Sequence, residues 1–224
     1  MSCIFFLHVP KTAGQSFRKA AIDYFSKEST LLLYGEDSKT TSPIANQIFY
    51  KQKELTKKEK FQELSKEIDK KNIAFFSSHA SSVVLDNFKP QQAAIFLRNP
   101  IERLVSHYNY AIKKKHFSGS FETFIETPQY QNLYSAILQK TPLDKIRFIG
   151  LTEEYMESIK LFNHTFNVAL KIHHINKASL FPKIKSSLLS QDLQDKITDL
   201  NQQDFILYDE AKKLYQSRKN QMNS

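Results

Sequence analysis

"IFFLHVPKTAGQSFRKA" (residues 4–20) predicts a strand, a tight turn and a helix in direct succession. The apolar run meets the turn at Pro10, and an amphipathic pattern starts at Gly14. Free N–H groups at the start of a helix, together with the helix dipole, bind anions. The P-loop spelling G-x-x-x-x-G-K-[ST] is absent, because Lys11 precedes Gly14 instead of following it. The alternative is a plain turn with a surface lysine.

Further short apolar runs continue this alternation of strands and helices along the chain. Continuous apolar runs of this length suit strands that are buried on both faces of a parallel sheet. The sequence therefore predicts a single α/β domain over residues 1–224, with a central parallel sheet flanked by helices. The expected strands are residues 3–9, 31–34, 73–77, 93–98, 145–150 and 167–173.

Composition limits the classes of partner. The 224 residues have a net charge of +9, which favours anionic partners such as nucleotide phosphates or acidic glycans. The single Cys3 excludes a disulfide framework and a cysteine zinc site, and we see no obvious metal cluster. The apolar stretch near the N-terminus is too short for a signal peptide or a membrane span, so we expect a cytoplasmic protein without a transmembrane segment. The oligomeric state is left open.

A lysine-rich stretch occupies residues 51–71. Phe61, Leu64 and Ile68 recur at helical spacing and predict one apolar face. We interpret the stretch as a solvated surface helix. The alternative is a basic docking surface for an anionic acceptor.

A second candidate anion site lies in "AIFLRNPIERLVSHYNYA", residues 94–111. Asn99 is a good N-cap and Glu102 completes a capping-box pattern, so Arg98 is expected at the carboxyl end of a strand, where α/β proteins bind ligands. Ser106 follows two helical turns later on the same face, and an arginine plus a hydroxyl suits a phosphate monoester. The alternative is an Arg98 that pairs with a core carboxylate and a Ser106 without a binding role.

Five segments in order resemble signatures of the carbohydrate-type sulfotransferases, the family of the heparan sulfate and chondroitin enzymes, in the form of a soluble, bacterial-type member. "FLHVPKTAGQS" resembles F-x-H-I-P-K-T-G-G-T-S, and "FLRNPIERLVSHY" resembles R-D-P-x-x-R-x-x-S-x-Y. "FIGLTEEYMESIKLF" is similar to G-L-T-E-x-F-x-E-S-L-x-L. "HHINKAS" and "NQQDFILYDEAKKLY" are similar to the closing N-K-S and N-x-x-D-x-x-L-Y segments.

The resemblance implies a P-loop-like fold and 3′-phosphoadenosine 5′-phosphosulfate (PAPS) as co-substrate. It implies that Arg98 and Ser106 hold the 3′-phosphate, and that the first signature holds the 5′-phosphosulfate. The phosphosulfate site would comprise Lys11 and the amides of Thr12, Ala13, Gly14, Gln15 and Ser16. Ala13 and Gln15 depart from a usual Gly and Thr, and Asn99 replaces an Asp, but none of these changes removes a group that the chemistry requires.

Sulfuryl transfer is an in-line displacement that needs positioning and charge stabilisation and no metal. Lys11 is expected to neutralise the charge that grows on the bridging oxygen. His79, which follows the strand at 73–77 and matches a family Gly-His segment with Ser78 in place of Gly, is the expected general base. Glu36 and Asp37 are the alternatives. His8 is expected to orient the loop.

Acceptor recognition is expected in residues 35–72 and 113–145, where the resemblance is thinnest. The acceptor would be a hydroxyl, of a glycan or another carbohydrate. The main alternative is a non-catalytic nucleotide- or anionic-glycan-binding protein on the same fold. No base-reading motif supports nucleic acid, and an ATP or GTP kinase is disfavoured because Lys11 is misplaced. Arg103 and Tyr108 are expected to pack or pair within the fold, and Asn176 and Lys177 to cover the nucleotide.

Overall fold

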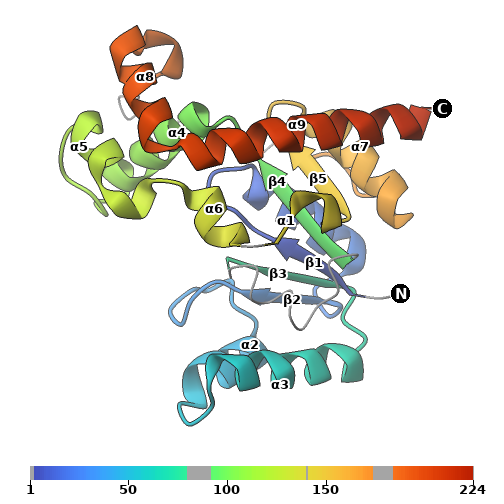
Figure 1. The fold of residues 1–224 in the computed structure, drawn as a ribbon. Helices are drawn as coiled ribbons and strands as arrows, with labels where there is room; N and C mark the ends of the chain where they lie inside the picture. Colours follow the sequence, from blue (N-terminus) through green and yellow to red (C-terminus); the bar gives the residue numbers. More distant parts are fainter. Residues whose placement is uncertain (1–2, 80–91, 140, 174–183, 224) are drawn as a thin grey trace.

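The computed structural model describes residues 3–79, 92–139, 141–173 and 184–223. Its centre is a parallel five-stranded sheet in the order β2-β3-β1-β4-β5 (Figure 1). This confirms the predicted α/β fold with a central parallel sheet. The strands are β1 Ile4–Leu7, β2 Thr30–Leu33, β3 Phe75–Ser78, β4 Ala93–Leu97 and β5 Phe148–Leu151.

The central strand β1 pairs with β3 on one side and β4 on the other. In this register Phe5 lies opposite Phe76 on β3 and Ala93 on β4. Every residue of the five strands is buried. Burial on both faces explains why the strands are continuous apolar runs and not alternating ones.

Helices cover the sheet and extend beyond both ends of it. α2 and α3 lie at the β2 end, and α9 packs along β5 (Figure 1). Within the described ranges, every helix is too short or too polar to span a lipid bilayer. The helices are α1 Gly14–Phe25, α2 Pro43–Asn46, the π-helix η1 Gln47–Lys51, α3 Lys57–Lys70, α4 Pro100–Lys113, α5 Phe121–Glu126, α6 Leu133–Leu138, α7 Tyr155–Phe166, α8 Gln191–Leu200 and α9 Gln202–Asn223, with 3₁₀ turns η4 Pro128–Tyr130, η5 Leu143–Lys145 and η6 Ser186–Leu188.

The lysine-rich stretch forms α3, which begins with a capping box between Thr56 and Glu59. Phe61, Leu64 and Ile68 are buried, as the helical spacing predicts. The exposed side of the helix carries pairs of opposite charge within one turn, such as Lys66 with Glu63 at 2.6 Å. This arrangement fits a solvated surface helix.

The predicted strand over residues 167–173 is wrong. Helix α7 ends there with Asn167 in a left-handed conformation, and Val168 donates back to the Asn163 carbonyl oxygen. The Asn163 side chain then pairs with both backbone groups of Leu170, at 2.9 and 3.0 Å. Because a side chain satisfies this backbone, the apolar residues pack without joining the sheet.

Thr152 lies outside the helix that follows β5, because α7 begins at Tyr155. The Thr152 N–H and hydroxyl both donate to the Leu97 carbonyl oxygen, so residue 152 continues the pairing of β4 and β5. Glu153 and Glu154 therefore precede the helix, and their carboxylates are directed to other elements.

Candidate active site

The turn between β1 and α1 has two residues in the left-handed region, Lys11 with φ 71° and Ala13 with φ 63°. Left-handed residues within a turn are typical of the backbone concavities that bind anions. The Thr12 side chain is fully buried, and its hydroxyl donates to the Val9 carbonyl oxygen at 2.9 Å. Thr12 therefore fixes the shape of the turn with its side chain.

Three N–H groups at the start of α1 are available to an anion. Within the described ranges, the N–H groups of Ala13, Gly14 and Gln15 donate no hydrogen bond. The Ser16 N–H, by contrast, donates to the Ala13 carbonyl oxygen at 3.0 Å. These unpaired donors and the helix dipole make the turn attractive to negative charge. The contribution of Ser16 is then its half-buried hydroxyl rather than its amide.

Position 14 requires glycine because the His8 ring packs against it. A Cβ atom at position 14 would lie 1.8 Å from the His8 Nε2 atom, so only glycine lets the imidazole pack against the first turn of α1. His8 is buried, and its ring stacks on Phe6 with centroids 5.4 Å apart. This packing is the physical basis for an orienting role of His8.

The structure brings the two predicted anion-binding segments together. The Arg98 Nη1 atom lies 3.5 Å from the Lys11 carbonyl oxygen. The Lys11 ammonium lies over the Tyr110 ring of α4, 4.2 Å from its centroid. The turn after β1 and Arg98, which follows β4, therefore form one cationic region across neighbouring strands, with Tyr110 of α4 beside it.

Arg98 forms an ion pair with Glu102, at 3.1 Å between Nη2 and Oε2. Glu102 is 39% exposed, so the partner of Arg98 is a surface carboxylate, one helical turn away, and not a core one. Ser106 is half-buried one further turn along α4. The side chain of Arg98 is 25% exposed, which leaves it accessible to a ligand.

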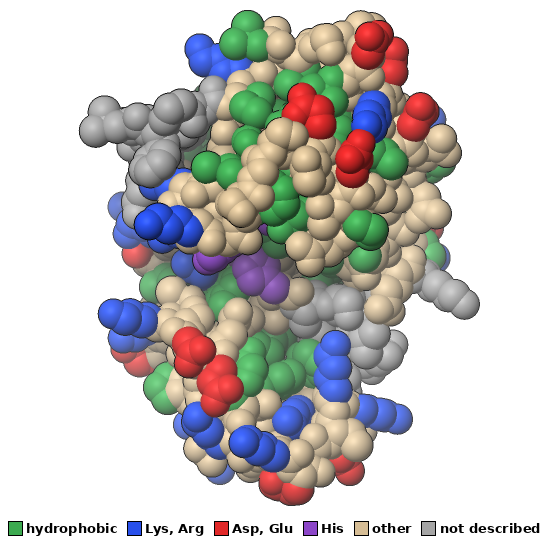
Figure 2. Space-filling view, turned by 90° about the vertical axis from the view of Figure 1, so that its left-hand side faces the viewer, with side chains coloured by type: hydrophobic (Ala, Val, Ile, Leu, Met, Phe, Trp, Pro, Cys, Tyr) green, Lys and Arg blue, Asp and Glu red, His purple; other side chains and the backbone are tan. Residues whose placement is uncertain are grey.

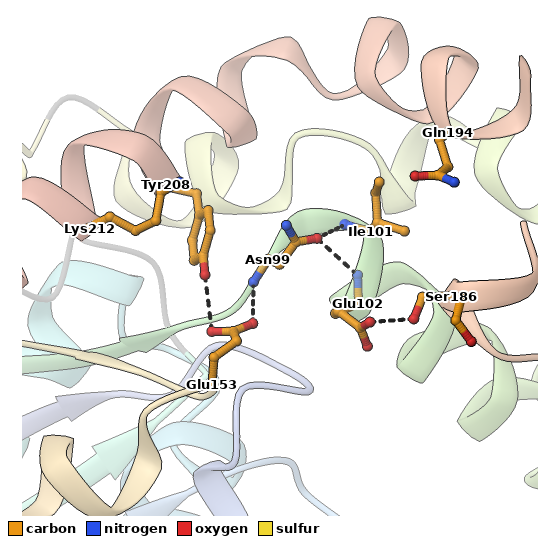
Figure 3. Close-up of a pocket in the computed structure, with 9 residues that line it drawn as sticks. Asn99, Ile101, Glu102, Glu153, Ser186, Gln194, Tyr208 and Lys212 are labelled. Atoms are coloured by element: carbon orange, nitrogen blue, oxygen red, sulfur yellow. Dashed lines mark hydrogen bonds between the residues drawn. The ribbon is translucent and has the colours of Figure 1, made fainter. Parts of the chain in front are cut away.

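Asn99 caps α4 as predicted, and its Oδ1 atom accepts from the Ile101 and Glu102 N–H groups. The predicted capping box is wrong, because the Asn99 N–H donates to Glu153 at 2.8 Å and not to Glu102. Glu153 also accepts from the Tyr208 hydroxyl of α9 at 3.1 Å. Figure 3 shows Glu153 between Asn99 and Tyr208, and the Glu102 carboxylate turned to Ser186.

A cavity of about 540 Å³ opens at this place (Figure 3). Its walls come from the start of α4, the residues before α7, η6, α8 and α9. Two carboxylates, Glu102 and Glu153, line it, whereas Lys11 and Arg98 are not among its lining residues. The cationic groups of the candidate site thus lie outside this cavity.

His79 directly follows β3 and packs against His8 at the end of β1. Its Nδ1 atom lies 2.7 Å from the His8 carbonyl oxygen, and its ring stacks on the His8 ring with centroids 4.4 Å apart. A carbonyl oxygen only accepts, so Nδ1 carries the proton and Nε2 of the neutral ring keeps its lone pair. His79 stays exposed overall, but its packed face is desolvated, and this lowers its pKa.

Tyr34 links the ends of three strands in a way that the sequence did not reveal. Its hydroxyl lies 2.9 Å from His8 Nδ1 and 2.5 Å from the Ser77 hydroxyl. Its ring meets the His79 ring edge to face at 4.7 Å. The only sequence signal was its place directly after a strand. Burial lowers the pKa of His8 well below its ordinary value, so this buried network is neutral at pH 7.

The alternative bases lie beyond Tyr34 on the surface. Glu36 is exposed and pairs with Lys51 at 2.8 Å, and this hydrogen bond lowers the pKa of Glu36. Asp37 is exposed as well. A carboxylate that is held by a lysine in solvent is a weaker base than a neutral imidazole.

Several motif residues prove to hold the fold together. Arg103 and Asp204 are both fully buried and face each other at 3.7 Å. Asp204 also accepts from the N–H groups of Tyr134 and Ser135 at the start of α6. The Tyr108 hydroxyl donates to the Gly119 carbonyl oxygen. The expectation that Arg103 and Tyr108 pack or pair within the fold is confirmed.

His107 of α4 is not part of the cluster around His8. Burial, with the charges of Arg103 and Lys11, lowers the pKa of His107 to about 4, and its ring packs on Phe124 and Tyr130. His174, Asn176 and Lys177 lie outside the described residues. Among the residues that are described, no group of three His, Cys, Asp or Glu side chains is placed to hold a metal ion.

Comparison with known proteins bears on this site. Residues 2–144 match the model of a protein family described as "Sulfotransferase family". The matched range covers more than half of the chain and includes the turn after β1, His79 and the whole of α4. A comparison with curated proteins gave no match.

Proposed function

Because this chain belongs to the sulfotransferase family of transferases, we propose that it moves the sulfuryl group of PAPS to a hydroxyl group of a carbohydrate. Membership in the family implies a PAPS-type donor in general. The observation that supports the proposal best is the contact between Arg98 and the Lys11 carbonyl oxygen, 3.5 Å apart. This contact brings the anion site at the start of α1 close to an accessible guanidinium. A ligand with two anionic groups needs two such sites near each other.

The residues present fit such a donor. The N–H groups of Ala13, Gly14 and Gln15, the side chain of Lys11 and the Ser16 hydroxyl would hold the phosphosulfate. Arg98 and Ser106 would hold the 3′-phosphate, with Arg98 exchanging its exposed partner Glu102 for the ligand. Since Glu102 is one turn away and half-exposed, this exchange needs no rearrangement of the core.

Lys11 is the proposed catalytic cation. Sulfuryl transfer leaves negative charge on the bridging oxygen, and an ammonium at that place stabilises the transition state more than the ground state. The contact of Lys11 with the Tyr110 ring is weak, on the order of 1 kcal/mol, so it does not prevent this role. Its flexible stem lets the ammonium leave the ring.

His79 is the proposed general base. The hydroxyl proton of the acceptor would pass to Nε2, because Nδ1 already carries a proton toward the His8 carbonyl oxygen. The lowered pKa of His79 keeps the ring neutral and ready to accept a proton at pH 7. The contact with His8 also fixes the ring next to the turn that holds the donor.

The two proposed acceptor segments lie in separate parts of the fold, α2 and α3 below β2 and α5 and α6 above it (Figure 1). Residues 35–72 include α2 and α3, and residues 113–145 include α5 and α6. Figure 2 shows a hollow between the upper and lower halves of one face, with histidine side chains in it and Lys or Arg side chains beside them. A hollow of this kind suits an extended polar acceptor such as a carbohydrate chain.

Titration with 3′-phosphoadenosine 5′-phosphate, followed by calorimetry, tests the donor site. We expect saturable binding, weakened about 10- to 100-fold by Arg98→Met because a charge-assisted contact is lost. Arg147→Met is a matched control, since exposed Arg147 contacts the Thr165 carbonyl oxygen and the Phe166 ring at the other end of the sheet. Absence of binding at millimolar nucleotide would refute the proposal.

A further inference from the structure

The two ring nitrogens of His8, which directly follows β1, have different surroundings. The residue is only 6% exposed, so each nitrogen depends on the protein or on a ligand for a partner. Nδ1 lies 2.9 Å from the Tyr34 hydroxyl oxygen. For Nε2, the described part of the chain supplies no hydrogen-bond partner. A buried ring nitrogen is therefore left over beside the anion-binding turn.

The Nε2 atom of His8 lies beside the first turn of α1. It would be 1.8 Å from a Cβ atom at Gly14. Because the Cα–Cβ bonds of a helix tilt toward its N-terminus, this place is at the N-terminal end of α1. The N–H groups of Ala13, Gly14 and Gln15 are at the same end. An anion bound by these amides is therefore next to Nε2.

The hydrogen bonds of Tyr34 determine which nitrogen of His8 carries the proton. Ser77 is fully buried, and among the described residues its hydroxyl has one partner, the Tyr34 hydroxyl at 2.5 Å. If Tyr34 donated to Ser77, the Ser77 proton would be buried without an acceptor, which costs roughly 1–3 kcal/mol. Ser77 therefore donates to Tyr34, and Tyr34 donates to Nδ1 of His8. A neutral ring that accepts at Nδ1 carries its proton on Nε2.

The surroundings of His8 keep its ring neutral at pH 7. Burial is the main cause that lowers its pKa, and the charges of three neighbours, His79, Arg18 and Lys11, lower it further. The hydrogen bond from Tyr34 fixes the direction of the ring. Nε2 is thus a neutral N–H donor in a fixed orientation.

We propose that the Nε2–H group of His8 is a further hydrogen-bond donor to the 5′-phosphosulfate, and that Tyr34 is the positioning residue that maintains this tautomer. A donor that is oriented before the ligand arrives binds an oxyanion strongly in a place from which water is excluded. A side chain at position 14 would displace Nε2, so Gly14 also serves this contact. This inference rests on the proposed function and adds His8 to its donor site.

Nitrogen-15 NMR of the histidine rings tests the tautomer in the wild-type protein. We expect the proton of His8 on Nε2, and the Nε2 resonance to shift when 3′-phosphoadenosine 5′-phosphate, the bisphosphate, is added. Adenosine 3′-monophosphate, which lacks the 5′-phosphate, should leave this resonance in place. A His8 proton on Nδ1, or an Nε2 resonance that the bound bisphosphate does not move, would overturn the inference.

Calorimetry with the same two nucleotides measures what the donor contributes. The amide group of an asparagine reaches only as far as Nδ1, whereas that of a glutamine reaches as far as Nε2. We expect His8→Asn to lower the preference for the bisphosphate over the monophosphate about 10-fold, and His8→Gln to recover most of it. Tyr34→Phe should lower the preference less, and its spectrum should show both tautomers of His8. His164→Asn, at an exposed position of α7, is the control and should keep the preference.

The outcomes separate the role of His8 from the proposed function. An unchanged preference in His8→Asn, or a His8→Gln variant as weak as His8→Asn, refutes the donor role of His8 alone. A wild type that binds neither nucleotide, or that does not prefer the bisphosphate, refutes the proposed donor site itself. The spectra of the wild type decide the tautomer even where a variant fails to fold.

Discussion

The Nδ1 atom of His79 lies 2.7 Å from the backbone carbonyl oxygen of His8, across the ends of β3 and β1. This contact fixes the ring tautomer, since the carbonyl oxygen cannot donate. It leaves the Nε2 lone pair for an incoming hydroxyl proton. His8, which packs against the anion-binding turn, therefore also orients His79, the proposed base.

Replacement of His79 by Ala should lower turnover by about 100-fold or more, with nucleotide affinity unchanged. The pKa of His79 is lowered by desolvation, so the wild type should stay active below the ordinary histidine pKa of about 6.5. The profile of kcat/KM against pH measures this. Glu36→Gln and Asp37→Asn serve as controls. Near-normal turnover of His79→Ala at neutral pH, with a loss in either control, would assign the base to that carboxylate.

Ala13→Gly should stabilise the protein by about 1 kcal/mol. Ala13 has φ 63°, where an L-residue other than glycine is strained, and glycine removes that strain. Urea unfolding measures the change. Ala20→Gly, in the middle of the same helix, is the matched control and should destabilise instead. A destabilised Ala13→Gly variant would show that the turn is not strained at this position.

His8 should make the fold less stable in acid. Its pKa is lowered in the folded state by burial and by the nearby charges of His79, Arg18 and Lys11. The unfolded chain therefore binds this proton at a higher pH than the native state, and stability falls as the pH drops below about 6.5, by up to about 1.4 kcal/mol per pH unit.

Urea unfolding of the wild type and His8→Asn, at neutral and at mildly acidic pH, tests this linkage. We expect His8→Asn to be less stable at neutral pH, because it loses the ring packing on Phe6, but to depend less on pH. Equal pH dependence of the two proteins would contradict the lowered pKa of His8.

The effects of replacing Arg103 and Asp204 on the free energy of unfolding should be coupled. Asp204→Ala leaves a fully buried guanidinium without its counter-charge and removes two hydrogen bonds at the start of α6, so we expect a loss of about 3–5 kcal/mol. Adding Arg103→Met to that variant should recover part of the loss. Thermal unfolding of the single and double variants measures this coupling. Purely additive effects would contradict a direct interaction.

Local sequence patterns predicted most of the strands and helices. Continuous apolar runs predicted all five strands, and Asn99 as an N-cap predicted the start of α4. The error at residues 167–173 arose because an apolar run also suits a segment whose backbone is paired by a side chain, here that of Asn163. Periodicity alone cannot distinguish these two cases.

The contacts between segments that are distant in the sequence could not be predicted from it. Glu102 fitted a capping box, but Glu153, 54 positions later than Asn99, takes the N–H group instead. Tyr34 meets His8 over 26 positions and Ser77 over 43. The order of strands in the sheet decides which of these residues come into contact. A single sequence contains no local signal for that order.

Transfer of labelled sulfate from PAPS to a panel of glycans tests the proposed reaction most directly, with Lys11→Ala measured beside the wild type. We expect label on at least one glycan, and a rate about 100- to 1000-fold lower for Lys11→Ala, because one stabilising contact to the leaving group is lost. Lys19→Ala, a surface lysine paired with Asp23, should match the wild type. Full transfer by Lys11→Ala would contradict the role of Lys11. Nucleotide binding without any transfer by the wild type would contradict the proposed activity and favour a non-catalytic binding protein.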